Sequence, residues 1–194
     1  SLWPQVSLFY GDLFLAVLLS IYAAYAWRLE HLNHNWNNLM TAPVPVRNIF
    51  WSKFLVIAGL SFVTQVFFFA LYLAAGFYFG FQSSIPPDVV RWFLCAWFGS
   101  LPVAAMQLFF AMRIRSFAVP VGIGFCCSVV GFLLAVKGWW PIFPNALLIA
   151  GMGSVSQEAL GEVDMGIFFV MCAMFTVIFC GLSLLVLKRT DVKS

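Results

Sequence analysis

The sequence predicts an all-α integral membrane protein in which five helices cross the bilayer. Of the 194 residues, 63% are hydrophobic and only 9% are charged, whereas soluble proteins carry about 25% charged residues. Uninterrupted apolar segments recur along the chain, each at least as long as the ~20 residues that a helix needs to cross a membrane. These segments use most of the length, so residues 1–194 are expected to form a single transmembrane domain without a soluble catalytic domain.

The apolar segments place the spans, and the charged residues orient them. The five predicted spans cover about 8–27, 49–81, 89–112, 117–136 and 166–187. Eight of the ten Lys and Arg residues lie on one predicted side, namely Arg28, Arg47, Lys53, Arg113, Arg115, Lys188, Arg189 and Lys193. Because cytoplasmic loops are enriched in Lys and Arg, this side and the C-terminus are expected to be cytoplasmic.

The other side is acidic and contains the first residue of the sequence. Its charged residues are Asp88, Arg91, Lys137, Glu158, Glu162 and Asp164. Five crossings counted back from a cytoplasmic C-terminus place Ser1 outside, which is an unusual start for a chain without a cleavable signal pattern. We therefore expect a six-span parent protein whose first helix precedes this sequence.

A short amphipathic helix is predicted at about 29–41, between the first two spans. Its apolar residues form one stripe, made of Leu29, Leu32, Trp36, Leu39 and Met40. Asn and His side chains cover most of the remaining surface, and the prolines that follow prevent the helix from continuing. Two roles are open: an interfacial helix resting on lipid, or a docking element for another protein. Lipid-bound helices usually carry Lys or Arg on the polar face, and this one is rich in uncharged amides instead.

A second short helix is predicted on the outer side, within residues 141–160. Its apolar core is too short to cross the bilayer, so a re-entrant or interfacial segment is expected. Asn145 is expected to cap its start. Glu158 and Glu162 follow, four residues apart, and would share one face of a helix. These two carboxylates either attract a cationic substrate or belong to a solvated loop.

Polar side chains inside the spans are the candidates for a substrate path. An ionised carboxylate is unfavourable in the bilayer, so Asp12 is expected to face protein or water. Gln65 and Gln107 either line the same path or form hydrogen bonds between helices. Pro102 and Pro120 are expected to kink their helices.

A set of short matches between residues 9 and 57 carries a family resemblance. It combines a Glu after a span, Asn residues before a Trp and a Leu, a Pro-Val pair, and an Ile before Ser-Lys. The residues are Glu30, Asn33, Asn35, Trp36, Leu39, Pro43, Val44, Ile49, Ser52 and Lys53. The segment resembles the second span, connector and third span of ABC type-two permeases, in particular those of bacitracin-export and lantibiotic-immunity transporters.

The resemblance implies a permease domain of an ATP-driven exporter in the bacterial plasma membrane. Its expected substrates are antimicrobial peptides of the lantibiotic or bacitracin kind, or lipid-linked amphiphiles, which implies a role in antibiotic resistance. The implied partners are two ATP-binding subunits, a second permease subunit in a homodimer or heterodimer, and membrane lipid, with no nucleic acid and no cofactor. The segment 29–41 becomes a coupling helix that docks on the ATPase through Glu30, Asn33, Trp36, Asn37, Leu39, Met40 and Pro43.

Other functions are weighed against the permease. An integral-membrane enzyme needs two or three polar catalytic groups at one depth, and the spans offer no such set. The sequence has no Gly-x-x-x-x-Gly-Lys-Ser/Thr loop, so ATP hydrolysis is expected on a separate subunit. His31 and His34 have only Glu30 nearby as a further metal ligand, so docking or solvated histidines are favoured over a metal site. A membrane subunit that senses peptide without transporting it stays open.

Overall fold

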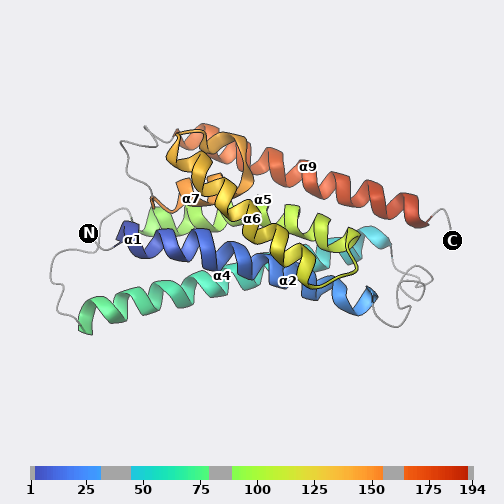
Figure 1. The fold of residues 1–194 in the computed structure, drawn as a ribbon, viewed down its shortest axis with the longest axis horizontal. Coiled ribbons are helices and arrows are strands. Elements are labelled where there is room, and N and C mark those ends of the chain that lie inside the picture. Colours follow the sequence, from blue (N-terminus) through green and yellow to red (C-terminus); the bar gives the residue numbers. More distant parts are fainter. Residues whose placement is uncertain (1–2, 32–44, 79–88, 155–163, 192–194) are drawn as a thin grey trace.

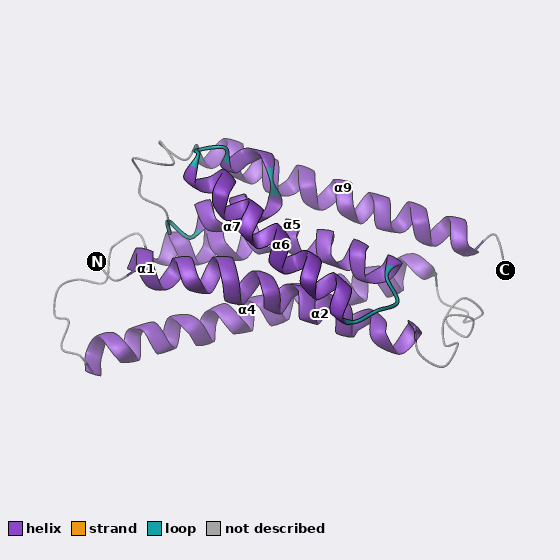
Figure 2. Ribbon diagram, viewed as in Figure 1, coloured by secondary structure: helices purple, strands orange, loops and turns teal. Residues whose placement is uncertain are grey.

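The computed structural model describes residues 3–31, 45–78, 89–154 and 164–191, and all regular structure in these ranges is helical (Figure 2). The elements are α1 (Trp3–Leu8), the π-helix η1 (Phe9–Leu15), α2 (Ala16–His31), α4 (Val46–Tyr78), α5 (Val89–Arg113), α6 (Ala118–Val136), the short 3-10 helix η2 (Trp140–Ile142), α7 (Pro144–Gly151) and α9 (Met165–Asp191). Five helical segments are long and apolar enough to cross a membrane, the first being Val6–Arg28. The predicted all-α membrane class with five spans is confirmed.

Helix α5 forms the centre of the bundle and packs against α2, α4, α7 and α9 (Figure 1). Its middle carries small and branched side chains, and Val103, Ala104 and Leu108 are completely buried. Small side chains let neighbouring helices approach closely, and close approach is the main source of helix association in a membrane.

Helices α4 and α9 lie at the periphery of the bundle. Only 28% of the α4 spanning window and 22% of the α9 window are buried, against 61% for α5. On α4, Leu55, Val63 and Phe67 each expose more than 60% of their surface. Exposed apolar surface of this extent suits contact with lipid or with another membrane helix.

The helix α7 lies inside the segment predicted to be re-entrant. All eight of its residues are buried, and it packs against α5, α6 and α9. This burial excludes a helix that merely rests on the surface of the bundle, while its depth in a bilayer stays a prediction. The predicted cap is wrong, because Phe143 occupies the N-cap position and Asn145 lies within the first turn.

Glycines allow α7 to approach its neighbours. A side-chain carbon added at Gly99 of α5 would lie 3.0 Å from the Leu148 Cα atom, and one at Gly131 of α6 would lie 2.5 Å from the Asn145 Cβ atom. The second distance is shorter than real carbon contacts, and the first would require α7 to shift by a few tenths of an ångström. The absence of a side chain at these positions therefore sets how closely α7 packs.

Most of the Lys and Arg residues in the described part of the chain lie at one end of the bundle. The ends of α2, α5 and α9 and the start of α4 lie together at the right of Figure 1. This basic end carries Arg28, Arg47, Lys53, Arg113, Arg115 and Lys188. Which membrane face it occupies stays a prediction.

The two prolines differ in their position. Pro102 lies inside α5, where the missing N–H weakens the helix. Pro120 is the third residue of α6. In this first turn a backbone N–H has no partner within the helix in any case, so the expected kink at Pro120 is wrong.

Candidate functional site

An ion pair at the basic end joins the end of α2 to the start of α4. Glu30 Oε1 and Lys53 Nζ lie 2.6 Å apart, and the two side chains are only 14% and 17% exposed. Burial reduces the screening of the two charges by water, so this pair is stronger than a surface ion pair.

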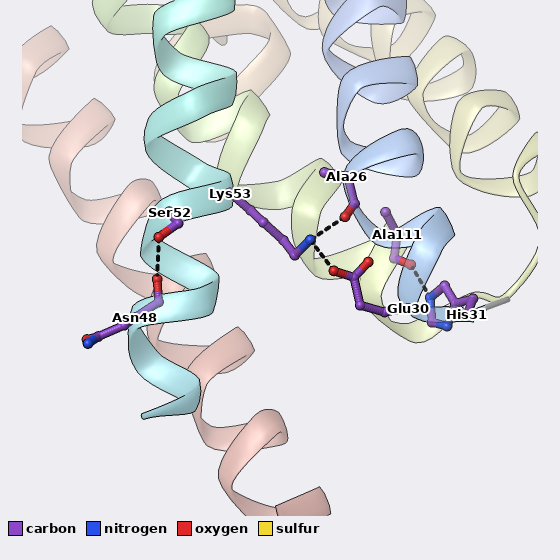
Figure 3. A network of polar contacts seen from close by, with 7 residues as sticks. All are labelled: Ala26, Glu30, His31, Asn48, Ser52, Lys53 and Ala111. Atoms are coloured by element: carbon purple, nitrogen blue, oxygen red, sulfur yellow. Dashed lines mark hydrogen bonds and ion pairs between the residues drawn. The ribbon is translucent and has the colours of Figure 1, made fainter. Parts of the chain in front are cut away.

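Lys53 makes two further contacts with α2. Its Nζ atom donates a hydrogen bond to the Ala26 carbonyl (Figure 3), and it lies 4.9 Å from the centre of the Trp27 ring. A carbonyl, a carboxylate and an aromatic face all favour an ammonium group. The side chain of Lys53 is thus held against the last turns of α2.

A third helix joins at the next residue. His31 Nε2 donates a hydrogen bond of 3.0 Å to the Ala111 carbonyl near the end of α5 (Figure 3). We call Glu30, His31, Lys53 and the Ala111 carbonyl the connector anchor. It joins the last turn of α2, which precedes residues 32–44, to α4, which follows them, and to the central helix α5.

The structure places part of the predicted coupling segment. Helix α2 continues to His31, so Leu29 and Glu30 belong to the spanning helix rather than to a separate helix that starts at 29. The other predicted docking residues lie outside the described residues, and they are Asn33, Trp36, Asn37, Leu39, Met40 and Pro43. Their docking role stays a prediction.

Gln65 is buried between α4 and α5. In the amide orientation that satisfies both polar atoms, its nitrogen donates to the Phe93 carbonyl at 3.2 Å and its oxygen accepts from the Trp97 backbone N–H at 3.3 Å. Gln65 therefore forms hydrogen bonds between helices, which was one of the two roles open from the sequence.

Gln107 differs, since its side chain is completely buried and neither amide atom has a hydrogen-bond partner among the described residues. It faces Gly124 of α6 and the region of Ser20 on α2, where a carbon added at Gly124 would lie 3.2 Å from the Gln107 nitrogen. Trp97 and Gln107 are separated by about 15 Å along α5 at 1.5 Å per residue. The two glutamines therefore do not share one site.

Replacing Gln107 by leucine is expected to raise the free energy of unfolding by about 1 to 2 kcal/mol, because a buried polar group without a partner is replaced by an apolar one of similar size. Gln65→Leu, which removes paired hydrogen bonds, is expected to lower it by about 1 kcal/mol. Unfolding of both variants in lipid nanodiscs measures the difference. A loss of stability in Gln107→Leu would show that its amide is paired in the native protein.

A small pocket lies beside Gln65, toward the end of the bundle opposite the basic end. It has a volume of about 10 Å³, which is just enough for one water molecule. Its lining is mostly aromatic and consists of Tyr10, Gln65, Phe68, Trp92, Phe93, Ala96 and Met152. We call it the aromatic pocket.

The remaining predicted path residues are not brought together. Asp12 lies in the π-helix η1, two residues after Tyr10, but its side chain is outside the described part of the structure. Glu158 and Glu162 also lie outside the described residues. Among those that are described, no group of three His, Cys, Asp or Glu side chains could hold a metal ion.

Sequence reasoning identified Glu30 and Lys53 singly but did not pair them. Their separation of 23 residues follows no helical spacing. The usable signal was the position of a lone acid at the end of one span and a lone base in the first turns of the next. Nothing in the sequence selects Tyr10 as a site residue, because it is one tyrosine in a span rich in aromatic residues.

Comparison with known proteins adds one match. The sequence model of the family described as ABC-2 family transporter protein matches residues 2–131, more than half of the chain. No curated protein and no solved structure matches significantly. The matched region includes the first two spans, the connector anchor and the whole of α5.

Proposed function

We propose, from the premise that this chain belongs to the ABC-2 transporter family and is the multi-pass permease part of an ABC transporter, that it forms the membrane pathway for ATP-dependent export of amphiphiles. Two separate ATP-binding subunits supply the energy, and a second permease subunit completes the membrane part. The substrate is an antimicrobial peptide of the lantibiotic or bacitracin kind or a lipid-linked amphiphile, expelled across a bacterial plasma membrane with the basic end in the cytoplasm.

The connector anchor is the observation that carries the coupling step. Residues 32–44 directly follow Glu30 and His31 at the end of α2. Helix α4 then begins seven residues before Lys53. A force on this segment reaches α2, α4 and α5 together, because an ion pair and a hydrogen bond join the three helices. ATP binding that moves the segment would therefore shift these helices as a unit, the kind of rigid-body movement by which switching proteins change state.

The interior suits an amphiphile better than an ion. The buried polar side chains among the described residues are uncharged, being serines and the amides of Gln65, Gln107 and Asn145. The exposed surface of α4 is apolar over most of its length. An amphiphile that stays partly in lipid needs a lateral apolar route of this kind, since the lipid itself solvates its apolar part.

The test is the double replacement Trp36→Ala with Leu39→Ala in the complex purified from native membranes. We expect loss of the copurifying ATP-binding subunits and of transport, because both side chains belong to the predicted docking stripe. The control is Phe125→Ala with Leu133→Ala on the exposed face of α6, which likewise removes one aromatic and one leucine side chain. Retained association and transport in the first variant would refute the docking role. ATP turnover stimulated by substrate without export would favour the sensing alternative.

A further inference from the structure

The ring of Tyr10 lines the aromatic pocket and stacks on another of its lining residues, Phe68. Its ring is parallel to that of Phe68 within 5°, and the two centroids are 3.7 Å apart. This distance leaves almost no sideways offset, so the rings form a face-to-face sandwich. Aromatic pairs prefer offset or edge-to-face geometry, so Tyr10 is held there by its surroundings rather than by the quality of the stack.

The hydroxyl of Tyr10 is a second unfavourable feature. It is buried and has no hydrogen-bond partner among the described residues. A buried tyrosine hydroxyl usually finds a partner, and leaving one unpaired lowers stability. A conformation in which Tyr10 turns toward lipid headgroups or water would satisfy it.

The backbone that carries Tyr10 can supply such a movement. Tyr10 is the second residue of η1, a π-helix within an otherwise α-helical span. A π segment contains an extra residue per turn, is rare, and occurs frequently at functional sites. Moving that extra residue along the helix rotates the side chains next to it.

The neighbouring contact is also adaptable. A carbon added at Gly11 would lie 2.2 Å from the Met152 Sδ atom, so η1 lies directly on Met152, which lines the same pocket. Methionine is flexible and makes favourable contacts with aromatic rings. The part of the lining that Met152 forms can therefore follow a change in the pocket's contents.

We propose that the aromatic pocket binds a flat aromatic group of the transported amphiphile, and that Tyr10 occupies this site until the ligand displaces it. The inference rests on the proposed export function and names the part of the substrate that is recognised. With Tyr10 in place the remaining volume of about 10 Å³ excludes a ring, so binding requires displacement. Phe68 then stacks on the ligand, and Trp92 and Phe93 border it.

The experiment uses two brominated amphiphiles with the complex in lipid nanodiscs. One is 4-bromobenzyl-dodecyl-dimethylammonium, and the other carries a 4-bromocyclohexylmethyl group in place of the bromobenzyl group. Bromine quenches indole fluorescence on contact, and Trp92→Phe identifies the contribution of Trp92 among the eight tryptophans. We expect Trp92-dependent quenching by the flat probe at about one tenth of the concentration that the bulky probe needs.

Substitutions of Tyr10 test the proposal through the direction in which they change the half-quenching concentration of the flat probe. Tyr10→Ala removes the internal competitor and is expected to lower the half-quenching concentration of the flat probe about tenfold. Tyr10→Phe removes the unpaired hydroxyl, strengthens the internal occupant and is expected to raise that concentration about fivefold. Tyr10→Leu also removes the stacked ring but keeps an apolar side chain in the core, so it replaces the alanine variant in this comparison if that variant does not fold. Phe125→Ala, on the exposed face of α6, is expected to leave that concentration unchanged.

Three results would overturn the proposal. Weaker binding by both Tyr10→Ala and Tyr10→Leu would make Tyr10 part of the binding surface rather than its occupant. Equal quenching by the two probes would indicate an acyl-chain pocket, and quenching that persists in Trp92→Phe would place the probe elsewhere. None of these measurements needs ATP hydrolysis, so retained association and transport in the Trp36→Ala, Leu39→Ala variant would refute the proposed docking role without refuting the pocket.

Discussion

Replacing Glu30 by alanine is expected to lower the free energy of unfolding by about 2 kcal/mol. Breaking a fully buried ion pair costs about 3 to 5 kcal/mol, and an exposed pair contributes about 0.2 to 1 kcal/mol. With 14% and 17% of the side chains exposed, the Glu30–Lys53 pair lies between these cases. The ammonium group of Lys53 would keep only the Ala26 carbonyl and the Trp27 ring.

Transport is expected to fall more steeply than stability in the same variant. The anchor joins both ends of residues 32–44 to the bundle, and a loosened end lets the connector move without moving α2 and α4. ATP hydrolysis should therefore continue while export per ATP decreases. Reconstituted vesicles in which ATP turnover and substrate release are measured together test this uncoupling.

Two further variants separate the ion pair from charge in general. Arg47→Ala removes an exposed charge in the first turn of α4 and is expected to change stability by less than about 0.5 kcal/mol. Exchanging the charges, Glu30→Lys with Lys53→Glu, restores the pair but leaves a carboxylate facing the Ala26 carbonyl and the Trp27 ring. We expect this exchange to recover only part of the loss. Equal destabilisation by Glu30→Ala and Arg47→Ala would show that the pair contributes nothing specific.

The fold class could be predicted from the sequence because bilayer crossing is a matter of length and polarity. Helix α4, for example, is an apolar segment bounded in the sequence by Arg47 and by the polar and proline residues within 82–88, and no tertiary contact is needed to recognise it. The family could be predicted from a few residues around Glu30 and Trp36, and the match over residues 2–131 confirms it. The antibiotic-peptide subgroup, the partners and the orientation stay predictions.

The candidate sites could be predicted only in part, because they depend on which helices become neighbours. Gln65 and Gln107 are equivalent as sequence, yet one pairs with the backbone of α5 and the other has no described partner. Likewise Asn145 has the chemistry of a cap, but Pro144 fits the first helical position and moves the boundary to Phe143. The local sequence indicates which roles these residues can have, and the packing of the helices determines which role each residue has.

Replacing Gly131 by valine is expected to cause the largest loss of stability, about 3 kcal/mol, the upper end of the usual range for an overpacked core. The first added carbon would lie 2.5 Å from the Asn145 Cβ atom and 3.0 Å from the Ala146 backbone nitrogen. Both obstacles are fixed to the backbone of α7, so no side-chain rotation relieves them. Helix α7, buried on all sides by α5, α6 and α9, would have to move as a whole.

Gly122→Val supplies the matched control for this variant on the same helix. Gly122 is exposed, and a carbon added there meets no atom within 4 Å. Valine also has a slightly better helix propensity than glycine, so stability should stay unchanged or rise by a few tenths of a kcal/mol. Unfolding of both variants in nanodiscs and cysteine accessibility at the buried Cys95 measure the outcome. If Gly131→Val were as stable as Gly122→Val, with Cys95 still protected, α7 would not pack against α6 at this distance.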